Sequence, residues 1–196
     1  IIVKKGRWNS IKELISDAKK NPGKLTYSTQ GVNSNADFMV RLLEEQAGIN
    51  LKMVPFPGNA ETITALLGGH IDLAVVGGTG GLYQAGRIDV LASGQKERLQ
   101  EYPNAPTLAE LGYPIFLNAN YFLCAPKGTP KEVLNKLYDA HQKAFTKYGP
   151  ELTAMFTKFE MYTDFISPEE VDKYNKTKRD EIRTTVKKMG ILVPNR

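Results

Sequence analysis

The sequence predicts an α/β fold in which a mainly parallel sheet is flanked by helices. Short apolar segments with strand character alternate with amphipathic helices, and the connections between them are short and rich in Gly and Asn. Residues 71–76 are apolar enough for a strand that is buried on both faces. With 196 residues, 41% of them hydrophobic, the chain can bury a real core as one large domain or two small ones.

The first helix has clear start and stop signals. Ser10 can cap it and Glu13 can complete a capping box, while residues 21–23 (Asn-Pro-Gly) end it. Its predicted buried stripe consists of Ile11, Leu14, Ile15 and Ala18. Four strands are expected at residues 24–28, 51–55, 71–76 and 88–92.

Helices are expected between these strands. One spans residues 36–47. A second begins at Asn59 as its cap, carries Ile63, Leu66 and Leu67 on its apolar side, and ends at residues 68–69. A short helical turn follows residues 77–81 and ends at Gly86.

The second half of the sequence has a different texture. A turn-rich stretch and a short helix at 108–111 precede a long strand over residues 115–125, in which Cys124 is expected to be a buried structural thiol. Two long helices and a strand follow, and the last helix has Ser167 as its cap, Pro168 at its first position and Glu170 to complete a capping box. These helices either cover the back of the first sheet or need a sheet supplied elsewhere.

Several function classes are disfavoured. The net charge of +5 raises nucleic acid as a partner, but the basic residues near the C-terminus alternate with acidic ones, as on a solvated helix face. No segment reaches the roughly 18 apolar residues of a membrane span, and no signal peptide is present. His70 and His141 belong to no catalytic or metal-binding motif, so we expect neither an enzyme nor a cofactor.

Three polar loops are predicted to meet at one edge of the sheet, because ligands of such sheets lie beyond the carboxyl ends of the strands. They are residues 28–35, 56–59 and 77–81. The first is either a simple helix cap or a neutral receptor for an anion, and the third is either a tight turn or a wall of backbone amides. Asp37, in the first turn of the helix that follows, should face away from this edge because it would repel an anion.

Seven segments resemble, in order, the tripartite tricarboxylate transporter substrate-binding family (Bug-type periplasmic binding proteins). They are residues 21–28, 31–35, 54–58, 66–72, 106–112, 125–130 and 167–170. The resemblance implies a two-domain clamp of the type II periplasmic-binding fold. Residues 9–120 would form the second, ligand-binding lobe, and residues 1–8 and 121–196 the hinge strands and the C-terminal part of the first lobe. The N-terminal part of that first lobe, on the order of a hundred residues, would be absent from this chain.

The resemblance also implies ligand-binding positions. They are Ser28, Thr29, Gly31, Asn33, Ser34, Asn35, Phe56, Gly58, Gly77, Gly78, Thr79 and, near the hinge, Tyr121. Two features depart from the family pattern. The family often has an acidic residue where this chain reads Val75-Val76-Gly77, and it commonly has His near Asp37. These departures imply a ligand that differs from the usual ones in its amino or hydroxyl substituents.

The function implied is an extracytoplasmic solute-binding protein. It would capture a small carboxylate (a di- or tricarboxylate or an acidic amino acid) for the permease subunits of a tripartite transporter. The precursor would carry a signal peptide, and the protein would be periplasmic or a membrane-anchored lipoprotein. The alternative from another class is an effector-sensing module of a transcription regulator with the same clamp fold. The chain as given is expected to self-associate.

Overall fold

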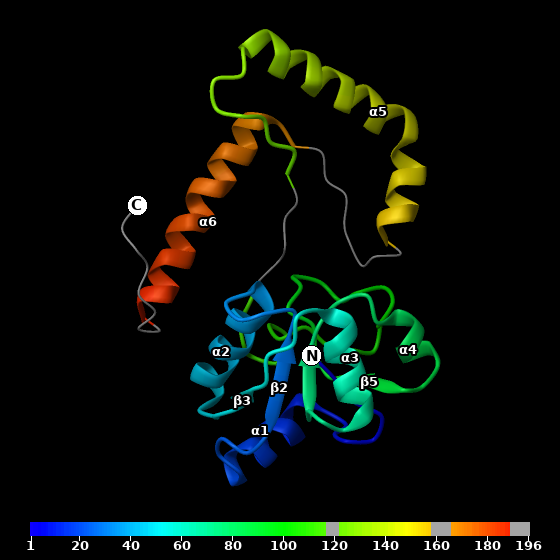
Figure 1. Cartoon of the computed structure of the whole chain (residues 1–196), viewed down its shortest axis with the longest axis vertical. Helices are drawn as coiled ribbons and strands as arrows, with labels where there is room; N and C mark the ends of the chain where they lie inside the picture. The colour runs from blue at the N-terminus through cyan, green and yellow to red at the C-terminus, as the bar shows by residue number, and fades with distance from the viewer. Residues whose placement is uncertain (117–121, 158–165, 189–196) are drawn as a thin grey trace. The chain divides into compact units, whose positions relative to one another are not determined.

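The computed structural model describes residues 1–116, 122–157 and 166–188 (Figure 1). The chain divides into two compact units. Among the described residues, the first unit holds 1–116, 122–125 and Thr157, and the second holds 126–156 and 166–188.

A five-stranded sheet forms the centre of the first unit, in the order β3-β2-β4-β1-β5. The strands are β1 (Ile2–Lys4), β2 (Thr26–Thr29), β3 (Lys52–Met53), β4 (Leu73–Val75) and β5 (Ile88–Val90). β2 pairs in parallel with β3 and with β4, whereas β1 lies antiparallel between β4 and β5. Four strands therefore run in one direction and β1 in the other, which confirms the α/β fold with a mainly parallel sheet.

Helices cover both faces of this sheet, and they are α1 (Ile11–Lys20), α2 (Asn35–Ala47), α3 (Asn59–Gly68) and α4 (Gly80–Gln84). The two faces have separate apolar clusters. One cluster joins α1 and α2 to Val3, and the other joins α3 and α4 to Ile2. Neighbouring residues of β1 thus belong to opposite layers, as the alternation of side chains along a strand requires. The N-terminal residues 1–8, expected near a hinge, contribute this internal strand, which lies between β4 and β5.

The start of α1 follows the sequence prediction. The Ser10 hydroxyl accepts a hydrogen bond from the Glu13 N–H at 3.2 Å, and the predicted stripe of Ile11, Leu14, Ile15 and Ala18 is buried. The Glu13 carboxylate accepts from the N–H of Asn9 at 2.9 Å. The capping box therefore reaches one residue further back than the standard arrangement.

The prediction that Asn59 caps α3 was wrong. Gly58 occupies the cap position with an extended backbone (φ −168°), and Asn59 is the first helical residue. The buried side of the helix also differs from the expected stripe. Its fully buried positions are Thr62, Ala65 and Leu66, and Ile63 and Leu67 are half-buried.

The prediction of a long strand over 115–125 was also wrong for the part that the structure describes. Residues 115–116 and 122–125 belong to no strand. Ile115 is buried, but residues 122–125 are exposed, and Leu123 is 81% exposed. Cys124 is exposed, not a buried structural thiol. Residues 108–111, predicted as a short helix, form turns instead.

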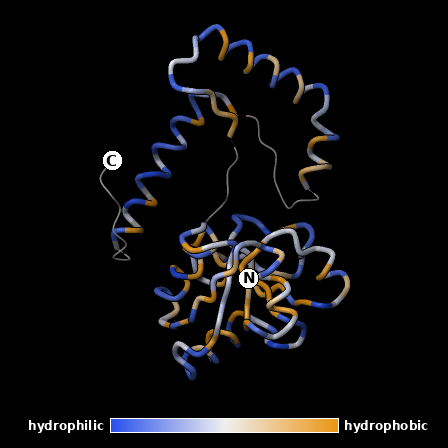
Figure 2. The backbone as a smooth tube through the Cα atoms, in the orientation of Figure 1, coloured by the Kyte–Doolittle hydropathy of each residue, from blue (hydrophilic) through white to orange (hydrophobic). Residues whose placement is uncertain are grey.

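The second unit consists of α5 (Lys131–Thr157) and α6 (Pro168–Lys188). α6 begins with the predicted capping box, in which the Glu170 carboxylate accepts from the Ser167 N–H at 2.8 Å and the Ser167 hydroxyl accepts from the Glu170 N–H at 3.2 Å. α5 contains Pro150 and has no fully buried residue. Hydrophobic residues recur along α5 in Figure 2, and Val133, Leu134, Leu137, Tyr148 and Met155 are all more than 40% exposed. The predicted accompanying strand has no counterpart in residues 126–157 or 166–188.

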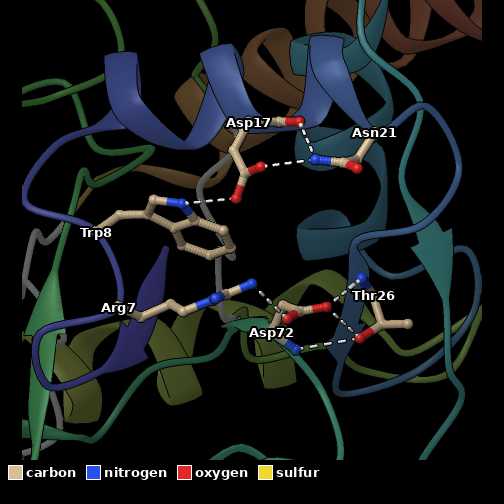
Figure 3. A network of polar contacts seen from close by, with 6 residues as sticks. All are labelled: Arg7, Trp8, Asp17, Asn21, Thr26 and Asp72. Atoms are coloured by element: carbon tan, nitrogen blue, oxygen red, sulfur yellow. Dashed lines mark hydrogen bonds and ion pairs between the residues drawn. The ribbon is translucent and has the colours of Figure 1, made fainter.

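A polar network ties the amino ends of β2 and β4 to the end of β1 (Figure 3). The Asp72 carboxylate accepts from the backbone N–H and the hydroxyl of Thr26 at 2.8 and 2.9 Å, and from Arg7 at 3.2 Å. The indole N–H of Trp8 donates to Asp17 in α1 at 3.1 Å. These contacts lie at the edge opposite to the predicted ligand loops, so they support the sheet and leave the loop edge to other residues.

Candidate functional site

The three predicted loops follow three adjacent parallel strands. The first follows β2, the second follows β3 and the third follows β4, and β2 lies between the other two strands. Because the carboxyl ends of parallel neighbours meet at one edge, the loop after β2 is flanked by the other two loops. Residues 28–35, 54–59 and 76–81 contain no charged side chain. The edge is therefore polar and uncharged.

The first two predicted positions lie under the loop surface. Ser28 and Thr29 are fully buried, and the Ser28 hydroxyl lies 3.4 Å from the hydroxyl of Thr62. The Thr29 hydroxyl donates to the Gly31 carbonyl at 2.8 Å and accepts from the Gly31 N–H at 3.2 Å. Both side chains are thus engaged with protein groups, and Thr29 fixes the turn that starts the loop.

The rest of the first loop is presented outward. Asn33 and Asn35 are exposed, whereas Gly31 and Ser34 are partly covered. Ser34 is the N-cap of α2, and its hydroxyl accepts from the Asp37 N–H at 3.2 Å. The helix-cap interpretation of this loop is therefore correct. The N–H groups of Gly31, Asn33 and Ser34 donate to protein acceptors, and the anion-receptor interpretation stays a prediction.

Asp37 is buried beneath this loop with zero exposure. Its carboxylate accepts from the Tyr27 hydroxyl at 2.8 Å, from the Asn33 N–H at 2.8 Å and from Arg41 at 2.9 Å. The prediction that Asp37 does not present its charge to the loop edge is consistent with these inward contacts. Arg41, one turn further along α2, forms an ion pair with Asp37.

Burial and hydrogen bonding set the ionisation of this group of residues. Burial raises the pKa of Tyr27, and the hydrogen bond to Asp37 raises it further, so the phenol keeps its proton. The hydrogen bond to Asp37 raises the pKa of the Arg41 guanidinium. On the same helix, burial raises the pKa of Glu44, whose carboxylate accepts from the Leu51 N–H at 2.6 Å.

The second loop leads into α3. Phe56 is partly buried and packs against the apolar cluster under α3 and α4. Gly58 is the N-cap of α3, and a side chain there would come within 3.1 Å of the Glu61 carboxylate. The Oδ1 atom of Asn59 is buried without a hydrogen-bond partner. This loop therefore brings the amide-rich start of a second helix to the same edge.

The third loop contains the tight turn that was one interpretation of its glycines, and the wall of backbone amides stays a prediction. Gly77 and Gly78 are exposed, and Gly78 has a left-handed φ of +74°, which a tight turn requires. Thr79 is buried, and its hydroxyl lies 3.0 Å from the hydroxyl of Tyr102. The loop is thus a fixed turn whose exposed backbone has no side chains to cover it.

The remaining candidates for a functional site are Tyr121, metal-binding clusters and His70. Tyr121, the last predicted position, lies outside the described residues. The described residues hold no group of three or more His, Cys, Asp or Glu that could bind a metal ion. His70 is exposed just after α3, and it lines a shallow surface hollow together with Phe56, Ala60, Glu61, Thr64 and Ala65. No residue of the first or third loop lines that hollow.

Two buried residues of this edge were missed by sequence reasoning. Thr62 donates its hydroxyl to the Thr29 carbonyl at 3.2 Å, and Tyr102 holds Thr79. Thr62 stands four positions before Leu66 and shares its buried side of α3, so a polar residue on that stripe was the available signal. Tyr102 lies in a turn-rich stretch with no periodicity to mark it.

The sequence profile of the tripartite tricarboxylate transporter family receptor matches residues 2–192. A Cupriavidus necator protein described as "UPF0065 protein in gbd 5'region" is 30% identical over 183 residues, which cover 93% of this chain and 55% of that protein. This chain therefore spans about half the length of that relative.

Solved structures agree with this match. A structure described as a periplasmic transporter has a TM-score of 0.82 and 29% identity, covering 97% of this chain and 64% of its own. R. palustris Rpa4515 with adipate has a TM-score of 0.79 at 22% identity, with the same coverage of both chains, and shows the fold. The predicted resemblance and fold class are confirmed: the chain belongs to the tripartite tricarboxylate transporter receptor family.

Proposed function

We propose that this chain supplies the ligand-binding lobe of an extracytoplasmic receptor that captures a small carboxylate for a tripartite transporter. The observation that carries the proposal is the convergence of three uncharged, amide-rich loops at the carboxyl edge of β3, β2 and β4. Family membership supports the receptor role.

The chemistry of this edge suits an anion. The amino ends of α2 and α3 both begin there, and helix amino ends offer unsatisfied N–H groups and a partial positive charge. The three loops contain no cationic side chain, and the nearby Arg41 is paired with Asp37. Such a receptor favours a carboxylate through hydrogen bonds and dipoles. The adipate held by the R. palustris relative is a ligand of this class.

The remaining parts of the proposal concern the whole protein. Residues 9–120, together with the strand formed by residues 2–4, would be one lobe of a clamp, and residues 121–196 would belong to the hinge and the other lobe. Closure of the two lobes on the ligand would create the form that docks on the permease. The site would bind without catalysis, in the periplasm or at the outer face of the cytoplasmic membrane. In the described part of the chain, no helix is long and apolar enough to cross a membrane.

A thermal-shift screen tests the carboxylate assignment. The protein encoded by the complete reading frame would be tested against adipate, malate, citrate, aspartate and glutamate, with uncharged sugars as controls. We expect saturable stabilisation by at least one carboxylate and none by the sugars. Stabilisation by an unrelated class alone would reject the assignment.

A matched pair of variants localises the binding. Gln30→Glu adds a negative charge to the first loop without changing side-chain size, and Gln46→Glu adds the same charge to an exposed position in the last turn of α2. Charge repulsion should weaken carboxylate binding about tenfold for Gln30→Glu and leave it unchanged for Gln46→Glu. Equal effects would place the carboxylate elsewhere.

A further inference from the structure

Asn33 has an unusual backbone conformation in the first loop. Its φ is +60°, and it is the only non-glycine residue with a positive φ among the described residues. Asn tolerates the left-handed region better than most residues, but the conformation is still unfavourable for a residue with a Cβ atom. Something in the surrounding structure must therefore hold it.

The Asp37 carboxylate makes the contact that holds it. The Asn33 N–H donates to Oδ2 of Asp37 at 2.8 Å. The carboxylate cannot readily move, because Oδ1 accepts from Tyr27 and Oδ2 also accepts from Arg41. Asp37 is fully buried, so water does not compete for these bonds.

The backbone of Asp37 fixes the next residue of the loop. Its N–H donates to the Ser34 hydroxyl, which lies 3.3 Å from the hydroxyl of Thr29. Ser34 in turn donates its own N–H to the Gly31 carbonyl at 3.3 Å. Asp37 thereby fixes two consecutive residues of the loop, one through its side chain and one through its main chain.

We propose that Asp37 is a positioning residue for the ligand loop, and that its carboxylate holds Asn33 in the left-handed conformation that presents residues 31–35 to the carboxylate. The second clause rests on the proposed function. Asp37 does not touch the ligand in this role, since its negative charge is directed into Tyr27, Asn33 and Arg41.

The test compares Asp37→Asn with a double variant that adds Asn33→Gly. An amide at position 37 has no charge for Arg41 and offers one acceptor atom in place of two, so the bond to Asn33 weakens. Glycine at position 33 adopts a positive φ without a carboxylate to hold it. Asp17→Asn is the matched control. The Asp17 carboxylate in α1 also accepts two side-chain hydrogen bonds, from Trp8 and Asn21, but it makes none with the ligand loop.

Two measurements are made on the whole protein. Amide hydrogen exchange, followed without ligand, reports the protection of the Asn33 and Ser34 N–H groups. Equilibrium binding of adipate and of citrate reports affinity. For Asp37→Asn we expect at least about tenfold faster exchange of the Asn33 N–H and about tenfold weaker binding. Asn33→Gly added to Asp37→Asn should restore most of the affinity, although it restores none of the lost bonds to Tyr27 and Arg41.

The outcomes separate this inference from the proposed function. If neither acid binds the wild-type protein, the exchange measurement still decides whether Asp37 holds the loop. Unchanged protection of Asn33 in Asp37→Asn overturns the positioning role. Weakened binding that Asn33→Gly does not rescue, or that Asp17→Asn reproduces, shows a loss of general stability and overturns it as well.

Discussion

Thr26 and Asp72 form a reciprocal pair across the parallel strands β2 and β4. The Asp72 carboxylate accepts from the N–H and the hydroxyl of Thr26, and the same hydroxyl accepts from the Asp72 N–H at 3.1 Å (Figure 3). The two residues are 46 positions apart in the sequence. They fix the register of two strands that carry neighbouring predicted ligand loops at their other ends, so they support the candidate site without belonging to it.

Thr26→Val should lower the free energy of unfolding by about 1–2 kcal/mol. Valine keeps the shape and the strand preference of threonine but removes both hydrogen bonds of the hydroxyl. Urea unfolding measures the change. Thr64→Val is the control, since Thr64 is exposed on α3 and its hydroxyl donates only to the Ala60 carbonyl in its own helix. Equal effects of the two substitutions would show that the Asp72 pair contributes no stability.

Gly78→Ala should destabilise the protein by about 1 kcal/mol through backbone strain alone. A Cβ atom at this position meets no atom within 4 Å, so crowding is absent, but the φ of +74° suits glycine. Gly81→Ala, also uncrowded and within α4, should be neutral or stabilising because alanine favours a helix. Thermal unfolding of both variants checks this, and a Gly78→Ala protein as stable as Gly81→Ala would contradict it.

Glu44→Gln should change how stability depends on pH. Burial raises the pKa of Glu44 above its ordinary 4.5, so the folded state binds this proton more tightly than the unfolded state does. The contribution of Glu44 to stability is therefore full below pH 4.5 and is lost as the pH rises through its folded pKa. Glutamine does not ionise, so its contribution to stability does not fall as the pH rises, and its side-chain oxygen can still accept from the Leu51 N–H.

Urea unfolding at pH 4, 5.5 and 7 measures this difference. The stability of Glu44→Gln relative to wild type should improve as the pH rises. Glu45→Gln, an exposed change on the same helix, is the matched control. A relative stability of Glu44→Gln that falls with rising pH would contradict the sign.

The exposed apolar residues of α5 should make the 196-residue chain associate with itself. Leu134 and Leu137 are 41% and 57% exposed on adjacent turns. Replacing both with Lys should raise the concentration needed for association by at least about tenfold, as followed by light scattering. Asn135→Lys adds charge to an exposed polar position of the same helix and should change little. A wild-type chain that stays monomeric would contradict this prediction.

The elements with local signals could be predicted from the sequence. The hydroxyls of Ser10 and Ser167 cap their helices by accepting from N–H groups three residues ahead, and the alternation of strands and helices predicted the α/β sheet. Elements that depend on distant partners could not be predicted in the same way. Cys124 sits in an apolar run that looks like a strand, but the described residues around it have no strand to pair with.

The candidate site shows the same division. The loops were identified from composition, but the residues that fix them come from elsewhere in the fold. Tyr102 holds Thr79 from 23 positions away, and Thr62 reaches the end of β2 from α3. The choice between Gly58 and Asn59 as the cap of α3 depended on backbone geometry that both residues permit. These contacts join residues that are distant in sequence, so no local pattern in the sequence predicts them.

The position of β1 between β4 and β5 affects when the sheet can be completed during synthesis. Ile2 pairs with Ala74 and Val90, and the nitrogen of Ile1 donates to the Ala92 carbonyl, 91 residues away. The strand partners of β1 in β4 and β5 are therefore synthesised about 70 to 90 residues after β1 itself. Contacts so distant in sequence slow folding, because long loops must close before they form. Among the described strands, β2, β3 and β4 pair with one another without β1, whereas β5 pairs only with β1, so β5 can join the sheet only through β1.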